Sequence, residues 1–488
     1  MDIPYVRKLT TPEDQKAFAR VNATAFVYSF DGEAFEPRTQ QQLSESFEEC
    51  YGYGNPVSSG MFIHAYDVWF DGVLTKATGV GGVASLPEAR GNGGIRKIFE
   101  VLIPDWYRDG VTFSILYPFS HEFYRKFGYE QVQKRYTYKL PIKSLGALPQ
   151  DRSARVVTDY HELETMCEIF GRRNNLYIKR KGSSQWHRVS EDPWKDLNYT
   201  YAIGDDAFLS FITKKPGKPG EGMTMVVRDI AFRDEKALRG LLGFLYTFRA
   251  QYDNLELPLP PSVPLIDMLP ECYDVSLEVT PRGMGRIVNV TKALRQMRYP
   301  ARAGRFTVYV TDPQIPENTG VFRINYADSK ATSVLKLGDS PAEVRPEELT
   351  EVQVFKPAEE TKDEDEKPTG FVFRKDWGED PEPLADYMTY TSSAAAGFLK
   401  ESEEKKAKEA AEAQKKAAAE AAKEAGEETP DAISSPVDLT CSIQVLTQLV
   451  LGTLSIDQVL YLPGVSCPNP TALRPIFVKK DIFFTDGF

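Results

Sequence analysis

The sequence contains few of the residues that build metal sites and disulfide frameworks. It has five cysteines and four histidines in 488 residues. The cysteines are far apart and form no CxxC pair, which fits a reducing compartment and excludes a zinc site built from cysteine. The histidines form neither an HxxxH nor an HExxH pair, so we expect no metal cofactor.

Long apolar segments are also missing. The most apolar stretch, residues 442–461, is interrupted by Gln444, Gln448, Gly452 and Asp457, and is too polar to span a bilayer. The N-terminal sequence has no basic flank followed by an apolar region, so we expect no secretory signal. Together with the scattered cysteines, these absences predict a cytoplasmic protein.

Basic residues do not gather into sustained runs. The chain has 59 Lys and Arg against 70 Asp and Glu, a net charge of −11. Nucleic acids and anionic membranes require clustered positive charge, so we expect neither as a partner, and a cationic partner suits this chain better. The hydrophobic content of 42% is enough to build cores, and at about 150 residues per domain the length predicts roughly three domains.

The first of these domains, residues 1–145, has mixed α/β signals. Two apolar runs flank Asp71-Gly72, a strong two-residue hairpin signal. Apolar residues at helical spacing predict a helix that begins at Gly94. Pro104 lies inside this pattern and is expected to kink or restart the helix.

The rest of the chain is divided by one compositional break. Residues 146–298 again mix strands and helices, whereas residues 299–488 contain a low-complexity insertion near 356–435. Within it, residues 401–428 are almost wholly Ala, Glu, Lys and Gln, strong helix formers without a Leu or Ile seam. We therefore expect an exposed helix or a helix-prone linker there rather than a coiled coil.

The most informative stretch runs from Val83 to Arg96, where a strand enters a loop rich in glycine and arginine that leads into a helix. Glycines let the backbone approach a ligand, and free N–H groups at a helix start bind anions. A dinucleotide and a coenzyme A both fit such a site. Residues 79–84 match the Gly/Ala form of GxGxxG, but they lie in a continuing strand and the helix begins only near Gly93. A glycine-rich turn without a ligand is the third interpretation.

A family resemblance favours coenzyme A. Arg90-x-x-Gly93-x-Ile95 resembles the acetyl-CoA loop of the GNAT N-acetyltransferase superfamily, although Ile95 stands where Gly or Ala is usual. With residues 119–130, this loop is similar to the enhanced-intracellular-survival (Eis) family, in which the loop also ends in a large aliphatic residue.

The resemblance extends down the chain and implies its fold. Residues 285–290 are similar to the family's linker into its third domain, and residues 306–320 to its sterol-carrier-protein-like domain. The implied fold class is α/β (α+β), with two GNAT-type mixed-sheet domains followed by a sterol-carrier-protein-like α+β domain. Residues 1–145 would bind acetyl-CoA, 146–298 would form a degenerate GNAT-like domain, and 299–488 the last domain. The central segment lacks a second Arg-x-x-Gly loop, so we expect no second CoA site there. The resemblance also implies a homo-oligomer, with a hexamer as the expected size.

The resemblance assigns binding roles for acetyl-CoA residue by residue. Val83 and Ser85 would present strand backbone to the pantetheine arm, and one of their N–H groups would polarise the thioester carbonyl. Ser120 would lie beside the end of the pantetheine. The remaining loop residues would hold the pyrophosphate: Arg90, Gly91, Gly93, Gly94 and Ile95.

It also implies the two proton-transfer groups. Tyr124 would be the acid that protonates the departing thiolate, and the terminal carboxylate of Phe488 would be the base. A carboxylate with an ordinary pKa of about 3.5 is a poor base for an ammonium group near 10.4, so burial must raise its pKa or water must relay the proton. His121 and Glu122 lie next to Tyr124 in the sequence and are the alternative acid or base.

The expected activity is an acetyl-CoA-dependent N-acetyltransferase that acts by direct attack of a primary amine. The acceptor class stays open among aminoglycosides, polyamines and lysine side chains. Asp31 and Glu33 are candidate contacts to this amine, and Asp486 is another next to the tail. The alternative is a non-catalytic binding protein that uses the sterol-carrier-like domain for an apolar ligand. That alternative predicts loss of the loop or of Tyr124, and both are present.

Overall fold

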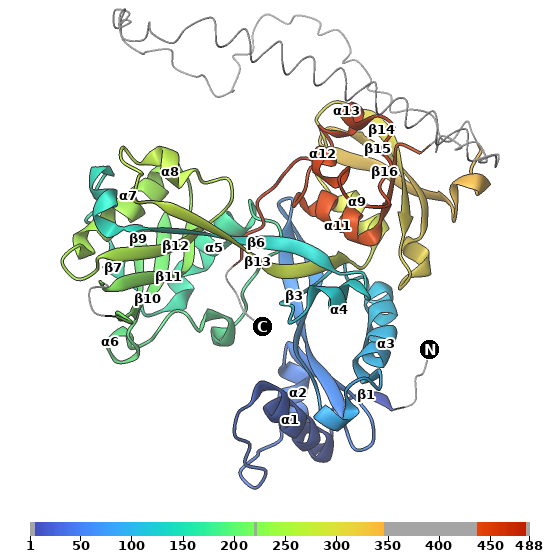
Figure 1. Cartoon of the computed structure of the whole chain (residues 1–488), viewed down its shortest axis with the longest axis horizontal. Coiled ribbons are helices and arrows are strands. Elements are labelled where there is room, and N and C mark those ends of the chain that lie inside the picture. Colours follow the sequence, from blue (N-terminus) through green and yellow to red (C-terminus); the bar gives the residue numbers. More distant parts are fainter. Residues whose placement is uncertain (1–4, 219–221, 346–436, 485–488) are drawn as a thin grey trace, which may run out of the picture. The chain divides into compact units, whose positions relative to one another are not determined.

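The computed structural model describes residues 5–218, 222–345 and 437–484 (Figure 1). The predicted insertion near 356–435 lies outside these residues, as do Asp486 and Phe488. The described residues fall within one compact unit by their contacts and form two sheets, one of 13 strands and one of four. In this part of the chain no helix has the length and apolar character needed to cross a membrane.

The N-terminal segment alternates helices with long antiparallel strands. Asp71 and Gly72 have φ values of 49° and 85°, as a two-residue hairpin turn requires, so the predicted hairpin is confirmed. Its elements are β1 (Val6–Lys8), α1 (Pro12–Phe26), α2 (Gln40–Glu45), β2 (Glu48–Tyr53), β3 (Ser59–Phe70), β4 (Val73–Ser85), α3 (Gly94–Arg108), β5 (Phe113–Leu116), α4 (His121–Arg125) and β6 (Glu130–Pro141).

Helix α3 continues through Pro104 without a break, so the expectation that this proline restarts the helix is wrong. Proline removes one backbone hydrogen bond from a helix. The face that contains Phe99, Leu102 and Ile103 is almost completely buried. Tertiary packing of this apolar face outweighs the lost hydrogen bond.

The central segment adds further strands to the same sheet and packs helices against them. Its elements are β7 (Arg155–Val156), α5 (Glu164–Gly171), β8 (Tyr177–Ile178), α6 (Pro193–Asp196), β9 (Asn198–Ile203), β10 (Ala207–Lys214), β11 (Thr224–Phe232), α7 (Glu235–Leu245), β12 (Asn254–Leu259), α8 (Leu265–Met268) and β13 (Ser276–Ile287).

One strand of the central segment completes the N-terminal sheet. Strand β13 pairs antiparallel with β5 through Met284–Ile287 and with β6 along most of its length. The other edge of β6 pairs with β12, so a single sheet runs in the order β1-β2-β3-β4-β5-β13-β6-β12-β11-β10-β9-β7. Figure 1 shows β6 and β13 side by side at the junction between the two segments. The sheet therefore continues across the predicted domain boundary between residues 145 and 146.

The last segment forms a separate four-stranded sheet in the order β16-β15-β14-β17. Helix α11 packs between this sheet and the N-terminal one, where the backbone N–H of Ile287 donates to Thr447 Oγ1 at 3.0 Å. The elements are α9 (Val290–Gln296), β14 (Gly304–Thr311), β15 (Gly320–Ala327), β16 (Lys330–Gly338), β17 (Leu439–Ser442), α11 (Ile443–Leu451), α12 (Ile456–Val459) and α13 (Pro470–Leu473).

A buried ion pair joins the last segment to the N-terminal sheet. Arg286 on β13 donates from Nη2 to Asp312 Oδ2 at 2.6 Å, and both side chains have no exposed surface. Asp312 Oδ2 also accepts from Asn318 Nδ2 at 2.9 Å. A buried charge that keeps its partner and its hydrogen bonds is tolerated, whereas a buried charge alone is costly.

Replacing one partner of this pair should destabilise the protein strongly. Asp312→Ala leaves Arg286 charged and buried, so the free energy of unfolding should fall by about 3–5 kcal/mol. The matched control is Asp457→Ala, because Asp457 pairs with Arg474 at 2.8 Å while both side chains are 53% exposed. That change should cost at most about 1 kcal/mol. Urea unfolding of the two variants tests this, and equal losses would contradict the role given to burial.

Candidate active site

The strand β4 contains a bulge where it approaches the predicted loop. Gly81 pairs with Phe62, but Ala84 pairs with Gly60. Between these two pairs β4 advances by three residues and β3 by only two, so β4 contains one extra residue. Gly82 lies within the bulge and has a φ of 53°, a conformation typical of a bulge glycine. The bulge turns the end of β4 away from the regular sheet.

Strands β4 and β5 separate beyond this bulge. Their parallel pairing ends at Val80 opposite Leu116, whereas β4 continues to Ser85. The backbone from Gly81 to Ser85 therefore has no strand partner on the β5 side. Free strand backbone next to a gap can hydrogen-bond an extended ligand such as a pantetheine arm.

The glycine loop ends in an open helix N-terminus. Gly91 and Gly93 have φ values of 84° and 76°, and no atom lies within 4 Å of where their side chains would start. Gly93 is the N-cap of α3, which has neither a capping side chain nor an acidic residue in its first turn. These N–H groups are therefore open to an anion. Ile95 is only 9% exposed, so its side chain joins the core and leaves its backbone to the site.

A cavity of about 620 Å³ connects these features, and seven predicted binding residues line it together. These are Val83, Ser85, Arg90, Gly91, Gly93, Gly94 and Ile95. The lining has three cations, Arg90, Arg96 and Lys126, and no acidic residue. Among the described residues no carboxylate forms an ion pair with any of the three. The cavity thus offers unpaired positive charge and free N–H groups, the requirements of a phosphate-bearing ligand.

Several residues that line the cavity were not predicted from the sequence. Ala25 and Phe26 reach the cavity from the end of α1, and Lys126 reaches it from the end of α4. Helical periodicity identifies α1 but does not say which sheet edge its last turn meets. Lys126 lies within residues 119–130, the stretch that carries part of the family resemblance, and that was the available signal for it.

Tyr124 lies directly behind the aromatic wall of the cavity. Its ring is 5.3 Å from that of Phe119 and 5.2 Å from that of Phe123, two residues that line the cavity. The side chain is 2% exposed, and burial raises the pKa of its phenol, with a smaller contribution from Tyr129. Among the described residues none forms a hydrogen bond with its hydroxyl. The hydroxyl is therefore protonated and available as a donor.

The other predicted residues have local structural contacts. Ser120 Oγ caps α4 by accepting from the N–H of Phe123 at 3.3 Å. Asp31 Oδ1 accepts from the backbone N–H groups of Glu33 and Ala34, which closes a turn in an exposed loop. Neither Asp31 nor Glu33 is among the residues that line the cavity. The described residues contain no cluster of three or more His, Cys, Asp or Glu able to hold a metal.

Family models match three parts of the chain. Residues 6–132 and 177–287 each match an acetyltransferase (GNAT) domain, and residues 290–353 match a sterol carrier protein domain. The chain is a GNAT-type acyltransferase. The fold class and the order of domains implied by the resemblance are thereby confirmed, and GNAT domains imply acetyl-CoA as co-substrate and an amine as acceptor.

Solved structures share the whole architecture of this GNAT protein. A GCN5-related N-acetyltransferase from Anabaena variabilis has a TM-score of 0.66 at 18% identity, over 99% of this chain and 100% of its own. Eis1 from Mycobacterium abscessus has a TM-score of 0.65 at 16% identity, over 99% of both chains. A probable N-acyltransferase from Enterococcus faecalis has a TM-score of 0.63 at 18% identity, over 98% of this chain and 99% of its own. At these identities the likeness shows the fold. No curated protein matches the sequence.

The second GNAT domain differs at the position of the anion site. Its strand β11 also leads into a helix, α7, but the N-cap is Asp234, whose carboxylate accepts from the N–H of Ala237 at 2.9 Å. Glu235 adds a second negative charge in the first turn. A pyrophosphate at this helix start would meet two carboxylates instead of a glycine loop, and this supports the expectation that only the first GNAT domain binds CoA.

Acetyl-CoA binding should depend on Gly93 specifically. Gly93→Asp places a side chain and a negative charge in the anion site, so acetyl-CoA binding should be lost in a folded protein. Gly464→Asp is a matched control, because Gly464 has a φ of 75° and equally open surroundings but is not among the residues lining the cavity. Calorimetry measures both variants. Unchanged affinity in Gly93→Asp, or equal loss in the control, would contradict the site.

Proposed function

We propose that this GNAT protein transfers an acetyl group from acetyl-CoA to a primary amine of an aminoglycoside, a polyamine or a lysine side chain. The observation that carries the proposal is the cavity itself. It joins a splayed strand, an uncapped helix N-terminus and three unpaired cations in one space. The splayed strand suits the pantetheine arm of CoA, and the helix N-terminus suits its pyrophosphate. The cations suit its remaining phosphate.

The reaction is direct attack of the amine nitrogen on the thioester carbonyl carbon. The N–H of Val83 or Ser85, on the unpaired side of β4, stabilises the developing oxyanion. When the C–S bond breaks, the phenol of Tyr124 gives its proton to the CoA thiolate. Burial raises the pKa of Tyr124, which keeps the phenol protonated until the thiolate forms, and the same dry surroundings disfavour the thiolate anion that accepts the proton.

Two features support a cationic acceptor. The protein carries a net charge of −11, and the cavity residues Ala25 and Phe26 are followed directly by the exposed loop that contains Asp31 and Glu33. An amine that approaches along this loop would meet these carboxylates before it reaches the thioester. Asp486, outside the described residues, is a further candidate contact.

A homo-oligomer, expected as a hexamer, remains part of the proposal and is measurable by light scattering.

The route of the tail supports a base from the last residues. Lys480 forms an ion pair with Asp71 at 2.6 Å, and Gln133 Nε2 donates to the carbonyl of Phe484 at 2.7 Å. The ring of Phe484 lies 6.1 Å from that of Tyr117, just beyond β5 and before α4. An extended segment from Phe484 to Phe488 spans up to about 14 Å, and the carboxylate of Phe488 is our proposed base for the ammonium proton.

Removal of the Tyr124 hydroxyl should affect turnover and not binding. Tyr124→Phe should lower kcat about hundredfold, a typical contribution of a general acid, with acetyl-CoA affinity unchanged. Tyr129→Phe is the control, because Tyr129 is equally buried but bonds Ser114 Oγ at 2.6 Å. Steady-state kinetics and calorimetry compare the two, and full turnover of Tyr124→Phe would refute the acid role.

The pH dependence of kcat follows from the raised pKa of Tyr124. The active form is the protonated phenol, and its pKa is raised above the ordinary value of 10. Deprotonation of Tyr124 should therefore cause no loss of turnover as the pH rises to about 10. An alkaline limb below that pH that disappears in Tyr124→Phe would contradict this environment.

The proposed base is tested by extending the chain. A neutral peptide added after Phe488 converts the carboxylate into an amide, so turnover should fall at least about hundredfold while acetyl-CoA still binds. The same peptide added before Met1 is the control. A C-terminally extended protein with full activity would remove Phe488 from the mechanism and direct attention to His121 and Glu122.

A further inference from the structure

The helix that carries Tyr124 is too short to hold its own geometry. Helix α4 has five residues, and helices of this length are not stable alone because nucleation is costly. Its N-terminal end is capped by Ser120. At its C-terminal end, Arg125 O accepts locally from the N–H of Gly128 at 3.1 Å, and the carbonyls there can also accept from donors elsewhere in the chain.

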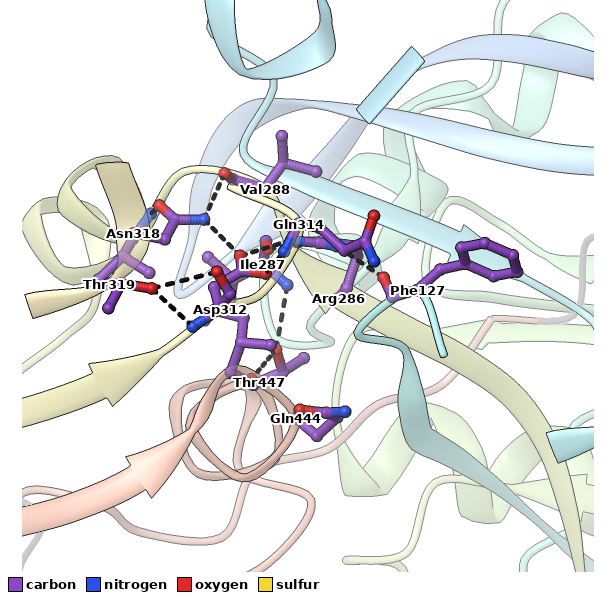
Figure 2. Close-up of polar contacts among 12 residues, drawn as sticks. Phe127, Arg286, Ile287, Val288, Asp312, Gln314, Asn318, Thr319, Gln444 and Thr447 are labelled. Atoms are coloured by element: carbon purple, nitrogen blue, oxygen red, sulfur yellow. Dashed lines mark hydrogen bonds and ion pairs between the residues drawn. The ribbon is translucent and has the colours of Figure 1, made fainter. Parts of the chain in front are cut away.

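Three consecutive carbonyls at this end each accept a hydrogen bond from a distant side chain. Arg125 O accepts from Gln444 Nε2 at 3.3 Å, and Lys126 O accepts from Gln314 Nε2 at 3.1 Å. Phe127 O accepts from Arg286 Nη1 at 2.6 Å. Figure 2 shows the side chain of Arg286 reaching Phe127, and the two glutamines donate to the neighbouring carbonyls from other elements.

All three donors depend on the sterol carrier domain. Gln444 lies in the first turn of α11, and Gln314 follows β14 by three residues. Arg286 comes from β13, but its guanidinium is fixed by Asp312, whose Oδ1 also accepts from the N–H of Gln314 at 3.0 Å. The short loop after β14 thus supplies one donor directly and orients another.

The residues held in this way belong to the reacting region. Lys126 and Phe127 line the cavity, and Tyr124 precedes them by two and three residues in the sequence. In the described part of the sterol carrier domain, Phe306 and Phe477 pack edge to face at 5.6 Å within the buried core. The hydrogen bonds from this domain to the end of α4 point to a role in the active site.

We propose that the sterol carrier domain is a positioning element for catalysis: through Gln314, Gln444 and Arg286 it caps α4 and fixes the phenol of Tyr124 against the cavity. This inference rests on the proposed role of Tyr124 as general acid. Gln314 and Gln444 are positioning residues, since they act through the helix and are not among the residues lining the cavity.

The test is a double-mutant cycle with Tyr124. The variant Gln314→Ala/Gln444→Ala removes two of the three donors and keeps the buried ion pair. It should lower kcat about tenfold, as expected for the loss of two ordinary hydrogen bonds. In the Tyr124→Phe background the same pair of changes should have almost no further effect, because the group they position is already absent.

The matched control lies one helical turn further along α11. Gln448 Nε2 donates to the carbonyl of Gln131 on β6 at 3.0 Å, so Gln448→Ala weakens the same domain contact without touching α4. It should leave kcat unchanged. Hydrogen exchange should be faster at the amides of residues 124–128 in the Gln314/Gln444 variant and not in the Gln448 variant.

The outcomes separate this inference from the proposed function. Full turnover of Tyr124→Phe would refute the acid role, whatever the glutamines do. A normal loss in Tyr124→Phe combined with an additive loss from the glutamine pair would overturn the positioning role, as would equal effects of Gln448→Ala or unchanged exchange in α4. If the double variant does not fold, Gln444→Ala alone, at one of the two exposed hydrogen bonds, takes its place in the cycle.

Discussion

The ion pair between Arg286 and Asp312 fixes three parts of the chain at one point. Arg286 belongs to a strand of the long sheet, its guanidinium also binds the end of α4 at Phe127, and Asp312 begins the loop after β14. Two charges with no exposed surface are costly to remove from water, and only a complete set of partners offsets that cost. A partial arrangement would leave a buried charge, so these parts take their positions together.

The long sheet imposes a second constraint on the first GNAT domain. Without β13, strands β5 and β6 would each expose an unpaired edge. The segment 1–145 therefore contains the cavity's loop and strands but not the complete sheet that supports them. The central segment supplies that strand, although its own helix start at Asp234 is unsuited to a pyrophosphate. Its contribution to the first domain is structural.

The charge of the cavity lining is opposite in sign to the net charge of the chain. The protein is strongly acidic, yet the cavity is lined by Arg90, Arg96 and Lys126 without an acidic residue. Local charge decides phosphate binding because screening limits the reach of distant charges to about 10 Å at moderate ionic strength. In the proposed reaction the amine meets the local carboxylates Asp31 and Glu33 in the exposed loop after α1, so different regions serve the two substrates.

The sequence by itself determined the features that depend on neighbours along the chain. The hairpin at Asp71-Gly72, the glycine loop and the helix start at Gly93 follow from conformations that few residues can adopt. Seven of the eight residues expected around CoA line one cavity because one strand–loop–helix unit contains them, whereas Ser120, outside that unit, is not among the lining residues.

The tertiary structure alone decided what holds this unit in place. The continuation of α3 through Pro104, the insertion of β13 and the capping of α4 all come from packing between distant segments. The donors to α4 lie 159, 188 and 319 residues from their acceptors. A glutamine that caps a remote helix has the same sequence pattern as one on an open surface, since the hydrogen bond is defined by position in space and leaves no local signal.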